Sequence, residues 1–216
     1  LHVRVAEEGA GYVVERAVGH GVQVRGAEDV ISVVVALGTL HAGDAIEALR
    51  ANYSDPVGAL ALHPAGREEQ LSWVARVPVD EVNAAYLGYV LRMASAQATR
   101  WRQLEAGLDP GYPHDLYPGG DGDAHDERLQ EIIEGAEPKW ERSGEGYKLN
   151  PERAVPIFVN AFRGVAYIYA YSGGLPGAGP AEKEQTARRL LRRNWSLRLG
   201  RLALDKHRDL AWEAQV

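Results

Sequence analysis

Two similar stretches occur in this chain, and the repeat restricts its fold more than any other feature. Residues 48–63 align with residues 190–205 without a gap, and eight of the 16 positions are identical. Residues 71–77 then align with residues 210–216, with four of seven positions identical. The best-matched pairs are Leu49/Leu191, Asn52/Asn194, Gly58/Gly200, Leu60/Leu202, Leu62/Leu204 and Trp73/Trp212. The repeat predicts that one folding unit occurs twice.

A segment rich in Pro, Gly and Asp separates the two copies. Gly107–Asp126 has no apolar periodicity, and residues 108–128 contain six acidic residues against one basic residue. The blocks on either side have the size of a small domain. We therefore predict a first domain over residues 1–107, an acidic linker over 108–126 and a second domain over 127–216.

The second copy has the clearer pattern of elements. Its first helix is predicted to begin near Glu127 with Asp126 as the N-cap, and its apolar stripe is Leu129, Ile132, Ile133 and Ala136. A strand or hairpin is expected at 140–149 and strands at 155–162 and 165–171. A helix over 181–195 and a hairpin of strands 199–205 and 210–216 should follow.

The first copy repeats the later part of this order. We expect strands at 3–6, 12–18, 30–37, 57–63 and 70–77, with a helix over 40–53. A long helix from Asp80 to about Ala106 should follow, with Asp80 as its N-cap. A complete unit would then have the order α-β-β-β-α-β-β-α. The first copy lacks the opening helix of this unit, and the second copy lacks the closing helix. Either the chain is trimmed at both ends or the copies share elements.

The composition restricts the class of protein further. The chain has no Cys, which excludes disulfides and thiolate chemistry and fits a reducing compartment. Its longest apolar run, Val30–Leu37, is far shorter than the roughly 20 residues of a membrane helix. The net charge of −6 argues against general nucleic-acid binding. We expect a soluble cytoplasmic protein.

Three patterns resemble catalytic or metal sites but lack an essential part. The Gly-rich stretch 173–179 has no following Lys-Ser or Lys-Thr pair, and Ser172 lacks the first Gly of a nucleophile elbow. The linker residues His114, Asp115, Asp121, Asp123, His125 and Asp126 have neither calcium-loop spacing nor that of paired helical histidines. We therefore expect no catalytic residue, no cofactor and no metal.

The repeated residues are better explained by structure than by chemistry. Asn52 and Asn194 are expected at helix ends, where Asn can satisfy backbone groups through its side chain or tolerate left-handed geometry. Gly58 and Gly200 are expected to open strands at places where a side chain would clash. Trp73 and Trp212 fall in the middle of strands and are expected in the core.

Two surfaces are candidates for partner binding. Arg188, Arg189, Arg192 and Arg193, extended by Arg198 and Arg201, form a basic ladder that would suit an acidic protein segment or nucleic acid. The alternative is a solvated helix face. Tyr167, Tyr169 and Tyr171 alternate along one strand and would give an apolar sheet face. The alternative there is packing under a helix.

The stretch Leu191–Asp205 and the strand after it resemble the YbjN family, with its pattern L-x-x-N-(aromatic)-x-x-x-x-G-x-(apolar)-x-L-(Asp). Leu49–Leu62 is similar but has Asp55-Pro56 where the family usually has apolar and small residues. The resemblance implies the α+β fold of type III secretion chaperones, an antiparallel sheet flanked by helices, in two tandem copies. It also implies a dimer, here a homodimer or a pseudo-dimer within the chain.

Members of this family are mostly described as regulators or chaperone-like partners. The resemblance therefore implies a non-enzymatic chaperone-like or adaptor protein that binds another, unidentified protein. Binding would occur by strand addition at a sheet edge or by capture of a segment on an apolar sheet face. One alternative is a nucleic-acid-associated regulator that uses the Arg-rich helix 188–201. Another is a small hydrolase with a site built across the two copies.

Overall fold

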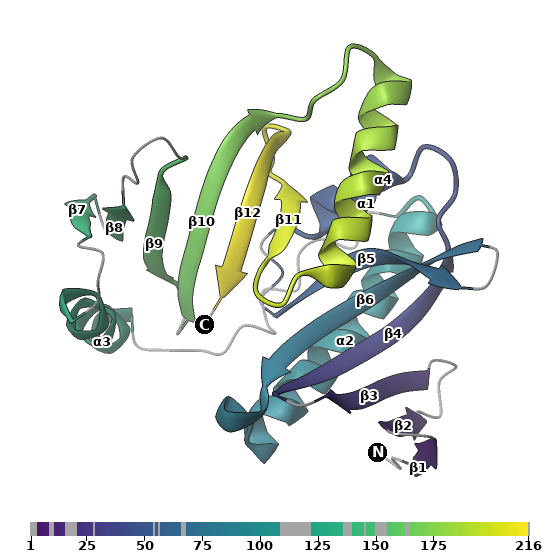
Figure 1. Ribbon diagram of the computed structural model, residues 1–216, viewed down its shortest axis with the longest axis horizontal. Helices are drawn as coiled ribbons and strands as arrows, with labels where there is room; N and C mark the ends of the chain where they lie inside the picture. Colours follow the sequence, from purple (N-terminus) through teal and green to yellow (C-terminus); the bar gives the residue numbers. More distant parts are fainter. Residues whose placement is uncertain are drawn as a thin grey trace.

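The chain is an α+β protein, shown as a computed structural model in Figure 1. The described residues are 4–8, 11–15, 21–27, 29–53, 55, 57–65, 68–108, 122–135, 140–144, 146–149, 155–162 and 165–215. Within them the strands form two antiparallel sheets, and four α-helices accompany the sheets. The predicted α+β class with antiparallel sheets is confirmed.

The first sheet is formed by strands from the first part of the chain. Its order is β1-β2-β3-β4-β6-β5, and every neighbouring pair is antiparallel. The strands are β1 (Arg4–Glu8), β2 (Gly11–Glu15), β3 (Gly21–Ala27), β4 (Val30–Thr39), β5 (Gly58–Ala65) and β6 (Glu68–Pro78). The prediction missed β3, whose alternating Val22 and Val24 form a short signal between two Gly residues.

The second sheet has the same strand order as the first. Its order, β7-β8-β9-β10-β12-β11, becomes that of the first sheet when β1 to β6 replace β7 to β12 in sequence. The strands are β7 (Glu141–Ser143), β8 (Gly146–Leu149), β9 (Ile157–Phe162), β10 (Val165–Gly174), β11 (Arg201–Leu204) and β12 (Asp209–Gln215). The predicted strand or hairpin at 140–149 is a hairpin, so four strands precede the helix instead of three.

The register of the strands is also the same in both sheets. Trp73 lies opposite Val35 and Leu60, while Trp212 lies opposite Ala170 and Leu202. Each sheet then has a register shift, after Ala36 in β4 and after Tyr171 in β10. The repeated stretches therefore adopt the same arrangement of helix end, edge strand and neighbouring strand.

A glycine lies at the equivalent position of the register shift in each sheet. Gly38 and Gly173 have positive φ angles of 118° and 86°. Residues with a Cβ rarely adopt this region, so Gly permits the bulge at both sites without steric strain.

Helices α1 and α2 belong to the first part of the chain. Helix α1 (Ala45–Ala51) is shorter than predicted, and α2 (Ala84–Glu105) follows a short 3₁₀ helix, η1 (Val79–Glu81). Asp80 is therefore not the N-cap of α2. Instead, the Asn83 side-chain oxygen accepts a hydrogen bond from the Tyr86 N–H at 2.9 Å.

Helices α3 and α4 belong to the second part. Helix α3 (Gly122–Glu134) begins before Asp126, which is therefore inside the helix and not its N-cap. Acidic residues in a first turn are favoured by the helix dipole, which explains the extension into the predicted linker. Within its predicted stripe Leu129 and Ile133 are buried, but Ile132 is 60% exposed. Helix α4 (Pro180–Ser196) agrees with prediction.

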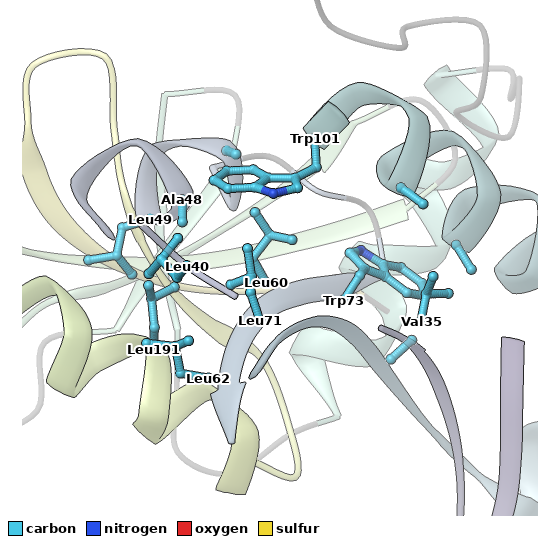
Figure 2. Packing of buried hydrophobic residues seen from close by; sticks show 14 of the residues in the cluster. Val35, Leu40, Ala48, Leu49, Leu60, Leu62, Leu71, Trp73, Trp101 and Leu191 are labelled. Atoms are coloured by element: carbon cyan, nitrogen blue, oxygen red, sulfur yellow. The ribbon is translucent and has the colours of Figure 1, made fainter. Parts of the chain in front are cut away.

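The largest apolar cluster contains residues from both parts of the chain. Helix α2 lies behind β4 to β6 in Figure 1 and covers one face of the first sheet. Figure 2 shows Trp101 of α2 above Leu60, and Leu191 of α4 beside Leu62 and Leu49. Because Leu49 and Leu191 are both fully buried in this cluster, α1 and α4 join the two parts through equivalent residues.

The repeated glycines make room for the repeated tryptophans. A Cβ on Gly58 would overlap the Trp73 indole, and a Cβ on Gly200 would lie 2.8 Å from Cε2 of Trp212. The predicted role of both glycines is therefore confirmed by the packing. Trp73 is further held by its Nε1 donating to Asp55 Oδ2 at 2.9 Å.

Asn52 and Asn194 join the two sheets by reciprocal hydrogen bonds. Asn52 Nδ2 donates to Leu60 O at 3.0 Å and to Leu202 O at 3.3 Å. Asn194 Nδ2 donates to Leu202 O at 3.0 Å and to Leu60 O at 3.3 Å. Each Oδ1 also accepts the N–H of the leucine on its own side. These reciprocal hydrogen bonds relate the two parts of the chain by an approximate two-fold axis.

This reciprocity predicts a coupling between the two asparagines. Asn52→Ala leaves Leu60 O with the bond from Asn194, whereas Asn52→Ala with Asn194→Ala removes both donors from both carbonyls. We expect each single change to reduce the free energy of unfolding by about 1–3 kcal/mol. The double change should exceed the sum by roughly 0.5–3 kcal/mol. Urea unfolding of the four proteins measures the coupling, and strict additivity would contradict it.

Candidate protein-binding surface

The candidate site is the second sheet, whose two faces differ in chemistry. Alternation along β10 and the register of its neighbours assign each side chain to a face. We call one the Tyr face, formed by Tyr167, Tyr169, Tyr171, Phe158, Asn160, Arg201 and Glu213. We call the other the Trp face, formed by Val159, Ile168, Ala170, Leu202, Leu210 and Trp212.

The Tyr face is a row of stacked aromatic rings. The centroid of Tyr169 lies 5.3 Å from that of Phe158, 5.1 Å from that of Tyr167 and 5.4 Å from that of Tyr171. All three tyrosines are half-buried. Their hydroxyls also have partners: Asn160 Nδ2 donates to Tyr169 at 3.1 Å, and the Tyr171 and Tyr53 hydroxyls are 3.4 Å apart.

A buried ion pair lies under one end of this row. Arg201 Nη2 is 3.0 Å from Glu213 Oε2, and these side chains are 3% and 0% exposed. Arg201 Nε donates to Asn52 O at 2.7 Å, and the Tyr167 hydroxyl donates to Glu213. Arg201 is therefore not part of the predicted basic ladder. It connects the second sheet to the end of α1.

The two tyrosine hydroxyls of this cluster stay protonated at neutral pH. Burial, together with the Glu213 carboxylate, raises the pKa of Tyr167. Burial and the contact with Tyr53 raise the pKa of Tyr171. Neither hydroxyl is thus activated as a nucleophile or base, and the cluster acts as a hydrogen-bonded support for the interface between the two parts.

At the equivalent interface on the first sheet, apolar residues replace the ion pair. The positions that match Arg201 and Glu213 are Ala59 and Val74. There, Trp195 of α4 packs on Val34, Ala61 and Val74 and stacks on His63 with ring centroids 4.0 Å apart. Trp195 of the second part therefore packs against the first sheet.

The predicted Arg ladder is divided between two environments. Arg188 Nη2 donates to His41 O at 2.8 Å and to Leu40 O at 3.3 Å, and Arg192 forms a bidentate pair with Glu69. The Arg192 hydrogen bond lowers the pKa of Glu69. These two arginines bind the first part of the chain and do not point away from it as predicted.

The other two arginines of the ladder lie on the surface. Arg189 and Arg193 are exposed and form no ion pair within the described part of the chain. Arg198 lies 3.5 Å from Asp29 in an exposed pair. Within the predicted helix face 188–193, Arg189 and Arg193 are therefore the two arginines open to a partner.

The different environments of the four arginines allow two double variants to be compared. Arg188→Glu with Arg192→Glu places acids beside Glu69 and removes the bonds to Leu40 and His41, so we expect a lower thermal midpoint. Arg189→Glu with Arg193→Glu should leave the midpoint unchanged, because both side chains are exposed. Differential scanning calorimetry checks the prediction. An equal effect of both pairs would contradict the assignment of contacts.

The Trp face is less buried than the matching face of the first sheet. Val33, Val35 and Trp73 are 0% exposed, Leu71 is 1% exposed and Leu60 is 4% exposed. Their counterparts Ile168, Ala170, Trp212, Leu210 and Leu202 are all half-buried. Helix α2 makes the difference, because it covers β4 and β6. Figure 1 shows α3 beside β9 and α4 beside β11, and none of the helices in the described ranges lies across β10.

A pocket of about 300 Å³ lies at the hairpin end of this sheet. Its walls include Ile46, Leu175, Lys183, His207 and Arg208. Among the described residues no group of three or more His, Asp and Glu is placed to hold a metal ion. His114, Asp115 and Asp121 lie outside the described residues, and Asp123, His125 and Asp126 lie in α3.

Comparison with known proteins gives no relative: no protein-family model, curated protein or solved structure matches the chain. The resemblance to YbjN proteins therefore stays a prediction. None of the helices in the described ranges has the length and apolar character needed to span a bilayer.

Proposed function

We propose that the protein is a non-enzymatic, chaperone-like adaptor that binds another protein through its second sheet. The observation that carries this proposal is the half-buried Trp face, whose counterpart on the first sheet is sealed by α2. A contiguous apolar surface on a folded protein is typical of an interaction site. In this proposal the two sheets are tandem YbjN-like units of the type III secretion chaperone type, paired within one cytoplasmic chain.

Capture on a sheet face is favoured over strand addition. Edge strands recruit other strands through unpaired backbone groups. On β5 and β11 the Asn52 and Asn194 amides already occupy the backbone groups of Leu60 and Leu202. The opposite edge strand of the second sheet, β7, has only three residues. The described edges of this sheet are therefore less suited to a partner strand than the Trp face is to an apolar segment.

The alternatives receive less support from the contacts. A nucleic-acid-binding helix would need its cations free, but Arg188 and Arg192 bind the first part of the chain. A hydrolase would need an accessible nucleophile beside a base. The ionisable groups of the Tyr cluster are buried and paired with one another. Both functions remain alternatives, and a steep salt dependence of DNA binding would favour the first.

Site-specific photo-crosslinking in the native cell tests the proposal. A photoreactive side chain at Tyr169 samples the Tyr face, and one at Ala170 samples the Trp face. The control position is Ile132, an exposed apolar residue on α3. We expect one discrete protein adduct from a sheet position and none from Ile132. Absence of any adduct at both sheet positions would contradict the proposed function.

A further inference from the structure

We propose that the pocket at the hairpin end of the second sheet binds a carboxylate that carries a short apolar chain, either a small branched-chain acid or the C-terminal residue of a peptide. The pocket can hold this ligand whether or not the Trp face binds a protein, so the assignment is independent of the proposed function. The lining of the pocket, its counterpart in the first half of the chain and one backbone angle support it.

One part of the pocket is apolar. Ile46 of α1, Leu175 of the loop before α4 and Leu204 of β11 line it. Leu175 and Leu204 are buried. The volume of about 300 Å³ is at the lower end of the range for ligand pockets, so the ligand must be small.

The other part of the pocket is basic. Lys183, His207 and Arg208 line it together with one acidic residue, Asp209. Among the described residues, neither Lys183 nor Arg208 forms an ion pair. An anion between these two side chains would therefore gain charge-assisted hydrogen bonds without displacing an acidic residue.

A side chain fills the matching site in the first half of the chain. Extending the aligned repeat by two residues pairs Ile46 with Arg188. Arg188 Nη2 donates to Leu40 O at 3.3 Å and to His41 O at 2.8 Å. Leu40 directly follows β4, as Leu175 directly follows β10. The shorter and apolar Ile46 therefore leaves open in the second half the space that Arg188 takes in the first.

The charge of the matching site is also reversed. Glu69 lies two residues before the aligned Leu71 and accepts a hydrogen bond from Arg192 Nη2 at 3.0 Å. The residue two positions before the aligned Leu210 is Arg208. The second half thus has a cation where the first half has the carboxylate that connects α4 to β6. A ligand carboxylate in the pocket would supply this negative charge.

The backbone at Arg208 supports a role for its side chain. Its φ angle of 66° is the one positive value at a non-glycine residue in the described part of the chain. Glycine adopts this conformation without steric cost, so an arginine at this turn adds backbone strain. Residues held in such strained conformations cluster at ligand-binding sites.

An NMR titration of the full chain tests the inference. The probe is N-acetylleucine, and its control is N-acetylleucinamide, which has the same apolar chain but no charge. We expect the acid to cause saturable shifts of the backbone amide signals of Lys183 and His207. The amide should bind about tenfold or more weakly, the usual effect of losing a hydrogen bond to a charged group.

Two variants separate binding from folding. Arg208→Gly removes one cation and relieves the positive φ angle, so it should stay folded and bind the acid about tenfold more weakly. Ile46→Arg with Arg208→Glu introduces the residues of the matching site and should abolish binding. The control Arg128→Ala removes an exposed cation on α3 and should bind as the unmodified chain does. Circular dichroism shows that each variant is folded.

Three outcomes would overturn the inference. They are no saturable shift with N-acetylleucine, equal affinity for the acid and the amide, or unchanged affinity in Arg208→Gly. Isocaproate, which has the same branched chain without the acetamido group, identifies the source of the ligand. Binding as tight as that of N-acetylleucine assigns the pocket to a free acid, and weaker binding assigns it to the C-terminus of a peptide. Both results support a carboxylate pocket.

Discussion

Arg201→Met is expected to reduce the free energy of unfolding by about 3–5 kcal/mol, because it leaves the Glu213 carboxylate buried without its cation. The substitution also removes the donor to Asn52 O and so weakens the contact between the two parts. Urea unfolding at pH 7 measures the loss.

The first sheet supplies the control for this prediction. Arg201→Ala combined with Glu213→Val gives the residues that stand at the matching positions, Ala59 and Val74. Removing both charges avoids an uncompensated ion, so the double variant should be more stable than Arg201→Met. A loss below about 1 kcal/mol for Arg201→Met would show that water reaches the carboxylate, contrary to the described burial.

Trp73→Ala should reduce the free energy of unfolding by about 3–5 kcal/mol, the usual loss for a fully buried aromatic side chain. The indole is 0% exposed, packs under α2 and donates to Asp55. Trp212→Ala should lose no more than about half as much, because its indole is half-buried and the removed contact area is smaller.

The comparison of the two tryptophans tests the asymmetry of the two faces. They occupy equivalent positions and contact equivalent glycines, and they differ in the helix that covers Trp73 and in its hydrogen bond to Asp55. Parallel urea titrations of the two variants provide the measurement. Equal losses would mean that the Trp face is as well covered as its counterpart, and the proposed binding surface would lose its support.

The repeat allowed the central contacts to be predicted from sequence. The matched Gly positions are ones at which a Cβ would meet the indole of the matched Trp. Asn52 was expected to satisfy backbone groups at a helix end. Its bonds instead reach β5 and, across the two-fold, β11. A pattern of neighbouring residues cannot predict a hydrogen bond between residues that lie so far apart in the sequence.

The similarity of the first strands was not visible in the sequence. Strands β2 to β4 and β8 to β10 adopt matching registers, and Gly38 and Gly173 lie at the same bulge. Strands accept many residues as long as the alternation of faces is kept, so little identity remains. Only a comparison of the two sheets exposes this part of the repeat.

The candidate site was predicted in part. Alternation placed the three tyrosines on one face correctly. Helical periodicity grouped the four arginines but does not identify the neighbour of each, so the Glu69 contact of Arg192 was missed. The cross-strand pair of Arg201 and Glu213 joins residues on different strands, and its burial depends on α1, which is distant in sequence.

The unlike chemistry of the two interfaces has a consequence for how the molecule can evolve. Trp195 packs on apolar side chains and stacks on His63, whereas the equivalent Tyr53 contacts a cluster that contains a buried ion pair. A second copy of the same half would therefore not reproduce the contacts that the two halves make with each other. Because the two halves are linked in one chain and make distinct contacts, one half can maintain the architecture. Mutations in the other half can then change what that half binds.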